Sequence, residues 1–390
     1  MIEKWKESLD NKGISGVILM DLSKAFDTIN HELLIAKLGA YGFDHQSLSL
    51  LLNYLSDRWQ RTKINTSFST WQELLMGVPQ GSVLGPLLFN IYINDLFYVI
   101  RNTHTCNYAD DTTLGSFSNS LEDVIYNLEH DTLCAIIWFE NNFMKLNEDK
   151  CHLLISGNLH EHLFAKVGDE LIWESSEAKL LGVTIDKNLN FNSHLIKLCK
   201  KAGQKVTALA RVAKLLSFHK RKLLLNTFIE SQFSHCPLIW MFCSRQMNAK
   251  INRIQERALR IIYNDYSSSF NELLRNDKTI SIHHRNIHCV AIEMFKVKNN
   301  LCPSFINELF SLRSGPCTRQ QNTFIRSKVG TVKGENSLRI FGPIVWNNML
   351  PISIKECSTL IEFKKSIKSW IPENCPCRLC KTYVQGLGYI

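Results

Sequence analysis

The sequence lacks a long uninterrupted apolar run. Its longest apolar stretch, residues 83–100, is interrupted by Gly85, Pro86, Asn94 and Asp95, and a bilayer interior penalises such residues. The polar, charged opening at residues 1–12 also lacks the apolar core and small-residue cleavage site of a secretory signal. We therefore expect no membrane span and no secretory signal, and we expect an intracellular protein of the nucleus or the cytoplasm.

Internal repeats and low-complexity tracts are also missing from the sequence, and its thirteen cysteines follow no regular spacing. Without secretory features, most of these cysteines are interpreted as reduced thiols. The 390 residues, 45% hydrophobic and 21% charged, suffice for two or three globular domains with real cores. This composition excludes a disordered or fibrous protein.

Charge is distributed unequally along the chain. Residues 1–190 hold 14 basic and 25 acidic side chains, whereas residues 191–390 hold 31 basic and 11 acidic ones. Acidic clusters suit cations, and a strongly basic region suits a polyphosphate backbone. The asymmetry indicates a protein that handles nucleic acid.

Hydrophobic periodicity predicts an α+β fold, with an antiparallel sheet covered by helices on one face, followed by a mainly helical basic region. We expect strands at residues 16–20, 102–107, 112–117, 152–155 and 180–185, and a hairpin within residues 62–75. Helices are expected as a pair joined by a glycine turn after Asn30, and then at residues 84–100, 121–143, 194–217 and 247–263. Three domains are predicted, spanning residues 1–190, 191–300 and 301–390.

The segment Tyr108-Ala109-Asp110-Asp111 places two carboxylates at the tip of the hairpin between residues 102–107 and 112–117. Hard divalent cations prefer carboxylate oxygens, and nucleotidyl transfer is well served by two such ions. The alternative is a plain turn, because aspartate readily adopts turn conformations. Motifs elsewhere in the chain are needed to choose between a metal site and a plain turn.

Two helices of the second half carry basic faces. Lysines Lys197, Lys200, Lys201 and Lys205 lie on one of them, and the second helix carries Arg253 and Arg257. Charged residues on a helix face often serve only to solvate its exposed side. The surrounding positive charge favours nucleic-acid binding by these six residues.

Three segments follow one another in a fixed order: Met20 to Asp27 (MDLSKAFD), Gly77 to Leu87 (GVPQGSVLGPL) and Tyr108 to Asp111 (YADD). Together they resemble the palm of reverse transcriptases, and their spelling resembles the jockey-like, LINE-type enzymes of non-LTR retrotransposons. The resemblance continues with Lys145-Leu146-Asn147 and Lys150, with a primer-grip strand at residues 180–183, and with a basic region at residues 253–262. It implies a palm, a thumb and a C-terminal extension.

The resemblance implies an RNA-directed DNA polymerase, which uses dNTPs, an RNA template and a DNA primer. Two Mg²⁺ or Mn²⁺ ions would promote attack of the primer 3′ hydroxyl on the α-phosphorus. Asp21 and Asp110 are the expected metal ligands, with the backbone carbonyl of Leu22 as a further oxygen ligand. Asp111 is the weaker ligand, because successive strand residues point to opposite faces.

Four further residues are candidates for substrate contacts. Phe26 occupies the position where the family holds an aromatic ring beneath the sugar, and a bulky ring would exclude a 2′ hydroxyl. Core packing is the alternative for Phe26. Gln80 and Gly81 would lie against the incoming dNTP, and Lys150 would protonate pyrophosphate unless it is simply a surface charge. Asp27 has no partner that the sequence predicts.

The thiols of Cys375, Cys377 and Cys380 cluster near the end of the chain, with Cys357 upstream. They suggest zinc, but structural zinc sites require four ligands. A histidine from residues 283–288 would complete such a site only if the chain folded back onto it. Zinc is therefore the weaker metal prediction.

The resemblance departs from the family at the start, because only about twenty residues precede Asp21. The fingers region and the endonuclease domain have no counterpart here, and either could belong to a longer parent chain. A truncated, inactive fragment that retains nucleic-acid binding is thus the main alternative function. A group II intron-type enzyme fits residues 180–263 less well, and a metal-dependent phosphohydrolase would need neither Phe26 nor the loop around Gln80.

Overall fold

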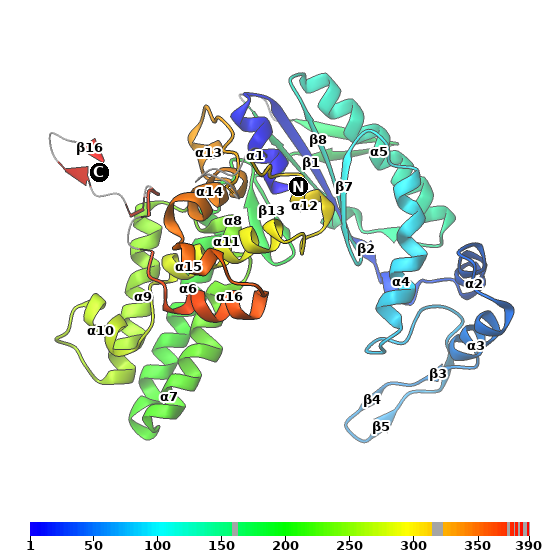
Figure 1. The fold of residues 1–390 in the computed structure, drawn as a ribbon. Coiled ribbons are helices and arrows are strands. Elements are labelled where there is room, and N and C mark those ends of the chain that lie inside the picture. The colour runs from blue at the N-terminus through cyan, green and yellow to red at the C-terminus, as the bar shows by residue number, and fades with distance from the viewer. Residues whose placement is uncertain are drawn as a thin grey trace. The chain divides into compact units, whose positions relative to one another are not determined.

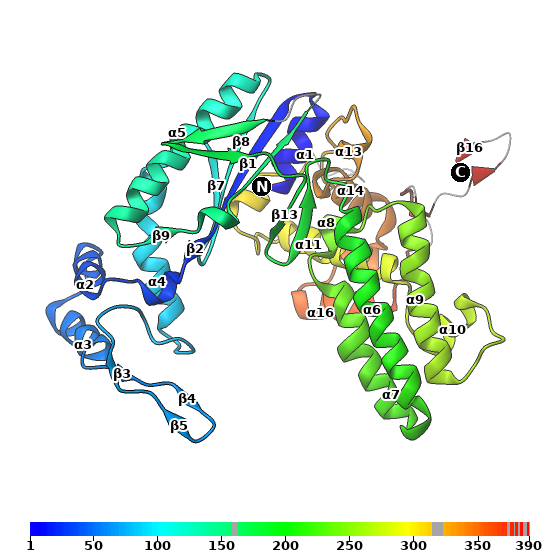
Figure 2. The same cartoon turned by 180° about the vertical axis from the view of Figure 1, so that it is seen from behind.

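The computed structural model describes residues 1–157, 163–313, 323–372, 375–377, 379–380, 383–384 and 388–389. The chain folds into two compact units. The first comprises Met1 and Glu3–Gly182, and the second comprises Ile2 and Val183–Ile390. The first unit contains the main sheet, and the second is mainly helical (Figures 1 and 2). The predicted division into three domains at residues 190 and 300 stays a prediction.

A four-stranded antiparallel sheet forms the centre of the first unit, in the order β10-β1-β8-β7. Strand β1 (Ile14–Met20) pairs with β10 (His152–Ser156) on one side and with β8 (Asp111–Ser118) on the other. Strand β7 (His104–Tyr108) lies at the edge and forms a hairpin with β8. The structure confirms the predicted antiparallel sheet and the hairpin that carries the two aspartates.

One long helix, α5 (Leu121–Asn141), covers a face of this sheet (Figure 1). Ser120 caps the helix by accepting a hydrogen bond from the Asp123 backbone N–H, as serine commonly does at this position. A Cβ on Gly16 would lie 2.6 Å from a Val124 methyl and 2.7 Å from a Leu128 methyl. Only glycine at this place in β1 lets α5 approach so closely.

Other predicted elements of the first unit are confirmed, with shifted ends. The helix pair after Asn30 is α2 (His31–Ala40) and α3 (His45–Leu55). A long hairpin follows, formed by β3 (Trp59–Gln60), β4 (Lys63–Ile64), β5 (Ser67–Phe68) and β6 (Gln72–Glu73). The remaining elements are α1 (Ile2–Asp10), β2 (Leu22–Ser23), η1 (Ala25–Asp27), β9 (Lys145–Leu146), η3 (Glu148–Lys150), β11 (Phe164–Val167) and β12 (Glu170–Trp173).

Two predicted elements have a different form in the structure. The helix expected over residues 84–100 is α4 (Gly85–Ile93), and it continues as the 3-10 helix η2 (Asn94–Tyr98). The single strand expected over residues 180–185 was wrong: β13 (Glu177–Leu180) and β14 (Val183–Asp186) lie on either side of a turn. The turn residues Leu181 and Gly182 have φ of 46° and 83°, values that no strand allows.

Helices of the second unit pack around apolar clusters, and two of these lie within the described residues. The first cluster joins α6 (Asn192–Val212), α9 (Arg245–Tyr263) and α10 (Phe270–Asn276), which contribute Val206, Leu259 and Leu273. The second joins α11 (Ile282–Lys298), α14 (Leu338–Ile344) and α16 (Leu360–Ser366). Figure 2 shows α6 and α9, the two predicted basic helices, side by side.

Shorter elements complete this unit. They are η4 (Ala213–Leu215), α7 (Phe218–Leu224), η5 (Leu225–Ile229), η6 (Glu230–Ser234), α8 (Pro237–Trp240), α12 (Ser304–Asn307), α13 (Val332–Glu335), η7 (Val345–Met349), α15 (Ile352–Lys355), η8 (Ile367–Ser369), β15 (Tyr383–Val384) and β16 (Gly388–Tyr389). None of the helices in the described part of the chain has both the length and the apolar character needed to cross a membrane.

Candidate active site

Asp21 follows the last residue of β1 and is held there by the segment around Lys150. Leu22 pairs with Leu146 across β2 and β9, and the Asn147 backbone N–H donates to the Asp21 carbonyl at 2.8 Å. Lys150 Nζ donates to Asp21 Oδ2 at 2.9 Å, and Asn147 Nδ2 approaches the same oxygen at 3.4 Å. The strand pairing therefore brings a cation and an amide to the Asp21 carboxylate.

Asp110 and Asp111 lie at the tip of the β7-β8 hairpin. Tyr108 pairs with Asp111 across the strands, so Ala109 and Asp110 form the two-residue turn. Ala109 has a φ of 52°, a left-handed conformation that is uncommon for residues other than glycine. The tight turn fixes where the two carboxylates can point.

A cleft of about 390 Å³ lies where the ends of β1 and β8 meet. Asp21, Asp111 and Lys150 line it, together with His152 and Lys179 among others. Neither Asp110 nor Leu22 is among the lining residues. Whether Asp110 or Asp111 is the stronger metal ligand stays a prediction.

Two lining residues of this cleft, His152 and Lys179, were missed by the sequence reasoning. Lys179 is a second lysine among the lining residues, in addition to Lys150. The sequence did contain a signal for Lys179, because this residue directly precedes the Leu180-Leu181-Gly182 segment.

The charged groups of the cleft influence one another. Burial raises the pKa of Asp111, and the nearby carboxylates of Asp110 and Asp21 raise it further, whereas Lys150 opposes the shift. The hydrogen bond to Asp21, and then the charge of Asp21, raise the pKa of Lys150 above its usual value. Lys150 is therefore protonated at neutral pH and partly neutralises a crowded group of three carboxylates.

The loop containing Gln80 is fastened to the turn that follows Asp21. The Val78 backbone N–H donates to the Phe26 carbonyl at 2.9 Å, and Gln80 Nε2 donates to Asp27 Oδ1 at 2.8 Å. Asp27 thus has the partner that the sequence did not reveal. Gln80 and the neighbouring Gly81 are both exposed.

Phe26 is half-buried rather than fully enclosed. Its ring stacks on the buried ring of Phe89, with centroids 4.5 Å apart. It contacts the apolar core on one side, and it does not line the cleft of Asp21 and Asp111. Core packing accounts for part of the Phe26 surface, and its contact with a sugar stays a prediction.

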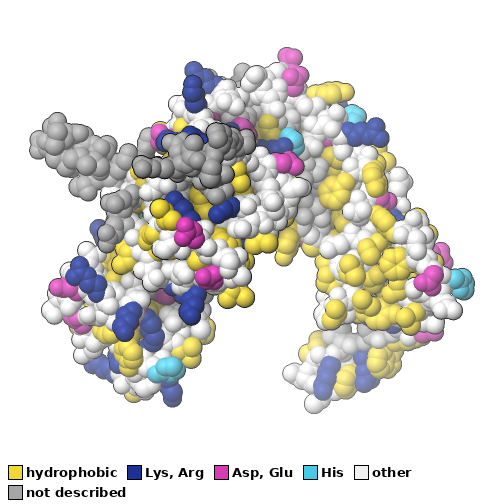
Figure 3. Space-filling view, in the orientation of Figure 1, with side chains coloured by type: hydrophobic (Ala, Val, Ile, Leu, Met, Phe, Trp, Pro, Cys, Tyr) yellow, Lys and Arg dark blue, Asp and Glu magenta, His cyan; other side chains and the backbone are white. Residues whose placement is uncertain are grey.

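The predicted nucleic-acid residues lie on the solvent-facing sides of α6 and α9. Lys197, Lys200, Lys201, Arg253 and Arg257 are exposed, whereas Lys205 is half-buried. Figure 3 shows Lys and Arg side chains spread over the part of the surface that α7, α9 and α10 occupy in Figure 1.

A second cleft, of about 460 Å³, lies between these two helices. It is lined by Gly203, Gln204, Thr207, Ala208, Arg211 and Arg257. Arg211 was missed by the sequence reasoning, although it recurs on the α6 face of Gly203 and Thr207 at four-residue spacing. The structure brings Arg211 and Arg257 together, and it leaves the four predicted lysines outside this cleft.

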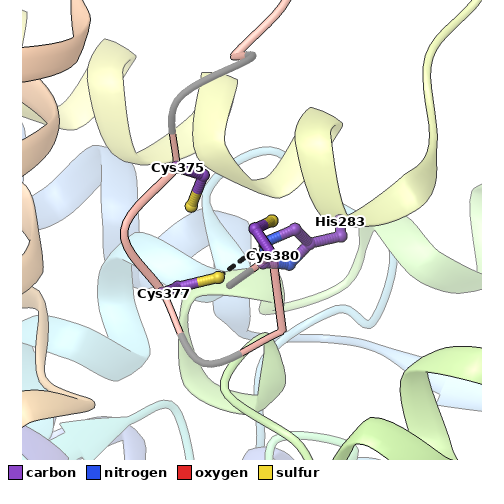
Figure 4. Close-up of side chains that lie close together, drawn as sticks. All are labelled: His283, Cys375, Cys377 and Cys380. Atoms are coloured by element: carbon purple, nitrogen blue, oxygen red, sulfur yellow. Dashed lines mark hydrogen bonds between the residues drawn. The ribbon is translucent and has the colours of Figure 1, made fainter. Parts of the chain in front are cut away.

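The three C-terminal cysteines lie together in the second unit. Cys375, Cys377 and Cys380 surround the imidazole of His283 (Figure 4). Cys357 is not in this group, and its thiol faces Ser366 at 3.6 Å. The chain therefore does fold back onto a histidine, and the fourth neighbour that the sequence left undetermined is His283.

Comparison with known proteins finds a family match for part of the chain. Residues 2–185 match the family described as reverse transcriptase (RNA-dependent DNA polymerase). These residues are fewer than half of the chain, and over them it is similar to reverse transcriptases.

Its relatives include enzymes of mobile elements. The chain is 27% identical over 277 residues to the probable RNA-directed DNA polymerase from transposon BS of Drosophila melanogaster, with 66% of this chain and 30% of the relative covered. It is 26% identical to the RNA-directed DNA polymerase from mobile element jockey of the same organism, with 52% and 23% covered. The predicted jockey-like resemblance is confirmed, and the chain spans less than a third of either relative.

Among solved structures, apo telomerase from Candida tropicalis is similar at 12% identity. The match covers 73% of this chain and 48% of the telomerase chain, with a TM-score of 0.38.

Proposed function

We propose that this chain carries out RNA-directed DNA synthesis, in which a dNTP is added to the 3′ hydroxyl of a DNA primer on an RNA template. The observation that carries the proposal is the cleft that Asp21 and Asp111 both line, where Lys150 binds Asp21. The family of residues 2–185 supports polymerase chemistry over that of a phosphohydrolase. We also propose an intracellular site of action, in the nucleus or the cytoplasm.

Reverse transcriptases generally use divalent metal ions, and the carboxylates of this cleft fit such ions. Asp21, Asp110 and Asp111 repel one another, and oxygen-binding cations offset this kind of crowding. We propose Asp21, Asp110 and the Leu22 carbonyl as ligands, and Asp111 as a weaker one. Two Mg²⁺ or Mn²⁺ ions would activate the primer hydroxyl and neutralise the charge on the departing pyrophosphate.

The chain's own residues would divide the remaining work. Lys150 carries a proton on Nζ next to the cleft and would donate it to pyrophosphate as a general acid. Gln80, held in place through Asp27, would lie against the incoming dNTP beside Gly81. Phe26, supported by Phe89, would exclude a nucleotide with a 2′ hydroxyl. Each of these roles rests on the proposed polymerase activity.

Primer extension on an RNA template with dNTPs and Mg²⁺ or Mn²⁺ tests this function. The wild-type chain should extend the primer, and Asp21→Asn and Asp110→Ala should abolish the product. Glu122→Gln is a matched control, because Glu122 is exposed on α5 and does not line the cleft. Extension that survives Asp21→Asn would exclude the proposed site.

A second function is nucleic-acid binding without catalysis. It is favoured by the cleft between α6 and α9, where Arg211 and Arg257 lie on a basic half of the chain. If the wild-type chain binds a primer-template with steep salt dependence but makes no product, this second function is the correct one.

A further inference from the structure

Four side chains with metal-binding atoms meet in the second unit, whereas the carboxylate cleft belongs to the first. His283 lies in the first turn of α11, whose N-terminus is capped by the Ser281 side chain. Cys375, Cys377 and Cys380 come from the segment after η8. One ligand atom from each of the four residues lies within 4.8 Å of all the others, and they form the single such group among the described residues. Figure 4 shows the three thiols around the imidazole.

The spacing of these atoms is close to that of a tetrahedral zinc site. Zn–S bonds of about 2.3 Å and Zn–N bonds of about 2.0 Å separate sulfur atoms by about 3.8 Å and sulfur from nitrogen by about 3.5 Å. The Sγ of Cys377 lies 3.2 Å from Nε2 of His283. Small side-chain adjustments are therefore enough to place one ion between all four ligands.

The local chain conformation holds the thiols on one side of the segment. The backbone N–H of Cys380 donates to the carbonyl of Cys377 at 3.1 Å, so the Cys-x₂-Cys pair closes a turn. Turns of this kind, with two residues between the cysteines, are frequent in zinc-binding segments. The arrangement thus has the backbone feature as well as the ligand set of a metal site.

Burial distinguishes a structural site from a catalytic one. His283 is 5% exposed and Cys375 is 6% exposed, while Cys377 and Cys380 are half-buried. Four protein ligands leave no coordination position open for a substrate.

We propose that His283, Cys375, Cys377 and Cys380 bind one structural Zn²⁺ ion, which fastens the segment 375–380 to the first turn of α11. Helix α11 belongs to the apolar cluster of α14 and α16, and Cys375 packs in the same cluster. The ion therefore adds a fixed link where apolar packing already brings the two segments together. Thiolate and imidazole ligands in tetrahedral geometry select zinc over Mg²⁺ or Mn²⁺.

The main competitor for these residues is a disulfide bond. All cysteines in the described part of the chain are free. A disulfide would join two of the three thiols at about 2.05 Å and leave the third thiol and the imidazole unused. Zinc uses all four groups.

Metal analysis of the full chain, purified under reducing conditions, tests the proposal. One zinc per chain is expected in the wild type, and a large loss is expected in His283→Asn and Cys377→Ser. His284→Asn and Cys134→Ser are matched controls outside the cluster, and both should retain the metal. Equal zinc in wild type and His283→Asn would overturn the ligand set.

Co²⁺ binding gives a readout that does not depend on variants that could fail to fold. Zinc-stripped wild type should give the intense visible bands of tetrahedral Co²⁺ with a thiolate charge-transfer band, and added Zn²⁺ should remove them. A chelator should lower the melting temperature of the wild type and not that of Cys377→Ser. Absence of zinc, a mapped disulfide among the three cysteines, or iron with sulfide would each overturn the proposal.

Discussion

At the scale of the residue, Phe26 is packed against the core and is also the proposed barrier to a 2′ hydroxyl. Stacking on the buried Phe89 fixes the orientation of the ring at a centroid distance of 4.5 Å. The rest of the ring remains accessible because Phe26 is only half-buried. A ring held from one side is suited to act as a rigid steric barrier on its other side.

We expect Phe26→Ala to increase ribonucleotide incorporation relative to dNTP incorporation in primer extension, because the barrier to a 2′ hydroxyl is removed. The loss of the stacked ring should also destabilise the first unit by about 1–3 kcal/mol, below the cost of truncating a fully buried ring. Single-nucleotide extension with matched dNTP and rNTP measures the ratio. Phe89→Leu, which removes the support and keeps the barrier, is the comparison. An unchanged ratio in Phe26→Ala would refute the assignment.

Gly77 fixes the loop of Gln80 against the turn of Asp27. Its φ is 86°, and a Cβ would lie 2.8 Å from the Cα of Asp27. Gly77→Ala should therefore add a steric cost of about 1–3 kcal/mol to the cost of the left-handed backbone. Urea unfolding of Gly77→Ala measures the sum of the steric cost and the backbone cost. Gly42→Ala, measured in parallel, gives the backbone cost alone. Gly42 has a similar φ of 93° with no atom within 4 Å of its Cβ position, and equal destabilisation by the two variants would contradict the steric argument.

At the scale of the element, Asp131 joins α5 to the start of β7. Its buried carboxylate accepts hydrogen bonds from the backbone N–H groups of Asn102 and Thr103, at 2.8 and 2.7 Å, and from the Thr103 hydroxyl at 2.9 Å. Burial would raise the pKa of Asp131, but hydrogen bonds from His130, Thr103 and Asn102 outweigh burial and lower it. The ionised form is therefore the one that stabilises the fold.

Asp131→Ala should lower the free energy of unfolding by about 2–4 kcal/mol at neutral pH, because it leaves two backbone N–H groups unpaired. A lowered pKa gives stabilisation that is present above the ordinary carboxyl pKa and lost as the pH falls through the lowered value. The difference in the free energy of unfolding between wild type and Asp131→Ala should therefore become smaller as the pH is lowered. Urea unfolding across this range measures it, with the exposed Glu122→Ala on the same helix as control. A difference that grows toward acid would contradict the assignment.

The elements themselves were largely predictable, since β1, the β7-β8 hairpin and α5 follow patterns of periodicity and turn residues. The turn at Leu181 was not, because an apolar run indicates a strand and nothing in leucine signals a positive φ. Contacts between residues far apart in the sequence also could not be predicted from local sequence patterns. Lys150 binds Asp21 from 129 positions away, and His283 meets Cys377 from 94 positions away. Such contacts depend on tertiary packing. The residue types indicate that a side chain can bind a charge or a metal, but they do not identify its partner.

At the scale of the whole molecule, acidic and basic side chains are concentrated in different halves of the chain. Residues 1–190 carry an excess of acidic side chains, among them the carboxylates of the cleft, and residues 191–390 carry an excess of basic ones. Phosphate contacts made by basic side chains release counterions from nucleic acid, so their number can be counted from the salt dependence of binding. The basic helices can therefore be tested independently of catalysis.

We expect Arg211→Gln and Arg257→Gln each to weaken binding of a primer-template and to reduce the slope of log K against log salt concentration by about 1. Both arginines line the cleft between α6 and α9. Arg260→Gln is the matched control on α9, because Arg260 Nη2 already donates to Glu256 at 2.6 Å. Fluorescence anisotropy over a range of salt concentrations measures the slopes. If the slope is the same in wild type and Arg257→Gln, or falls equally in Arg260→Gln, then the cleft does not contact phosphate and the charge of these helices serves solvation alone.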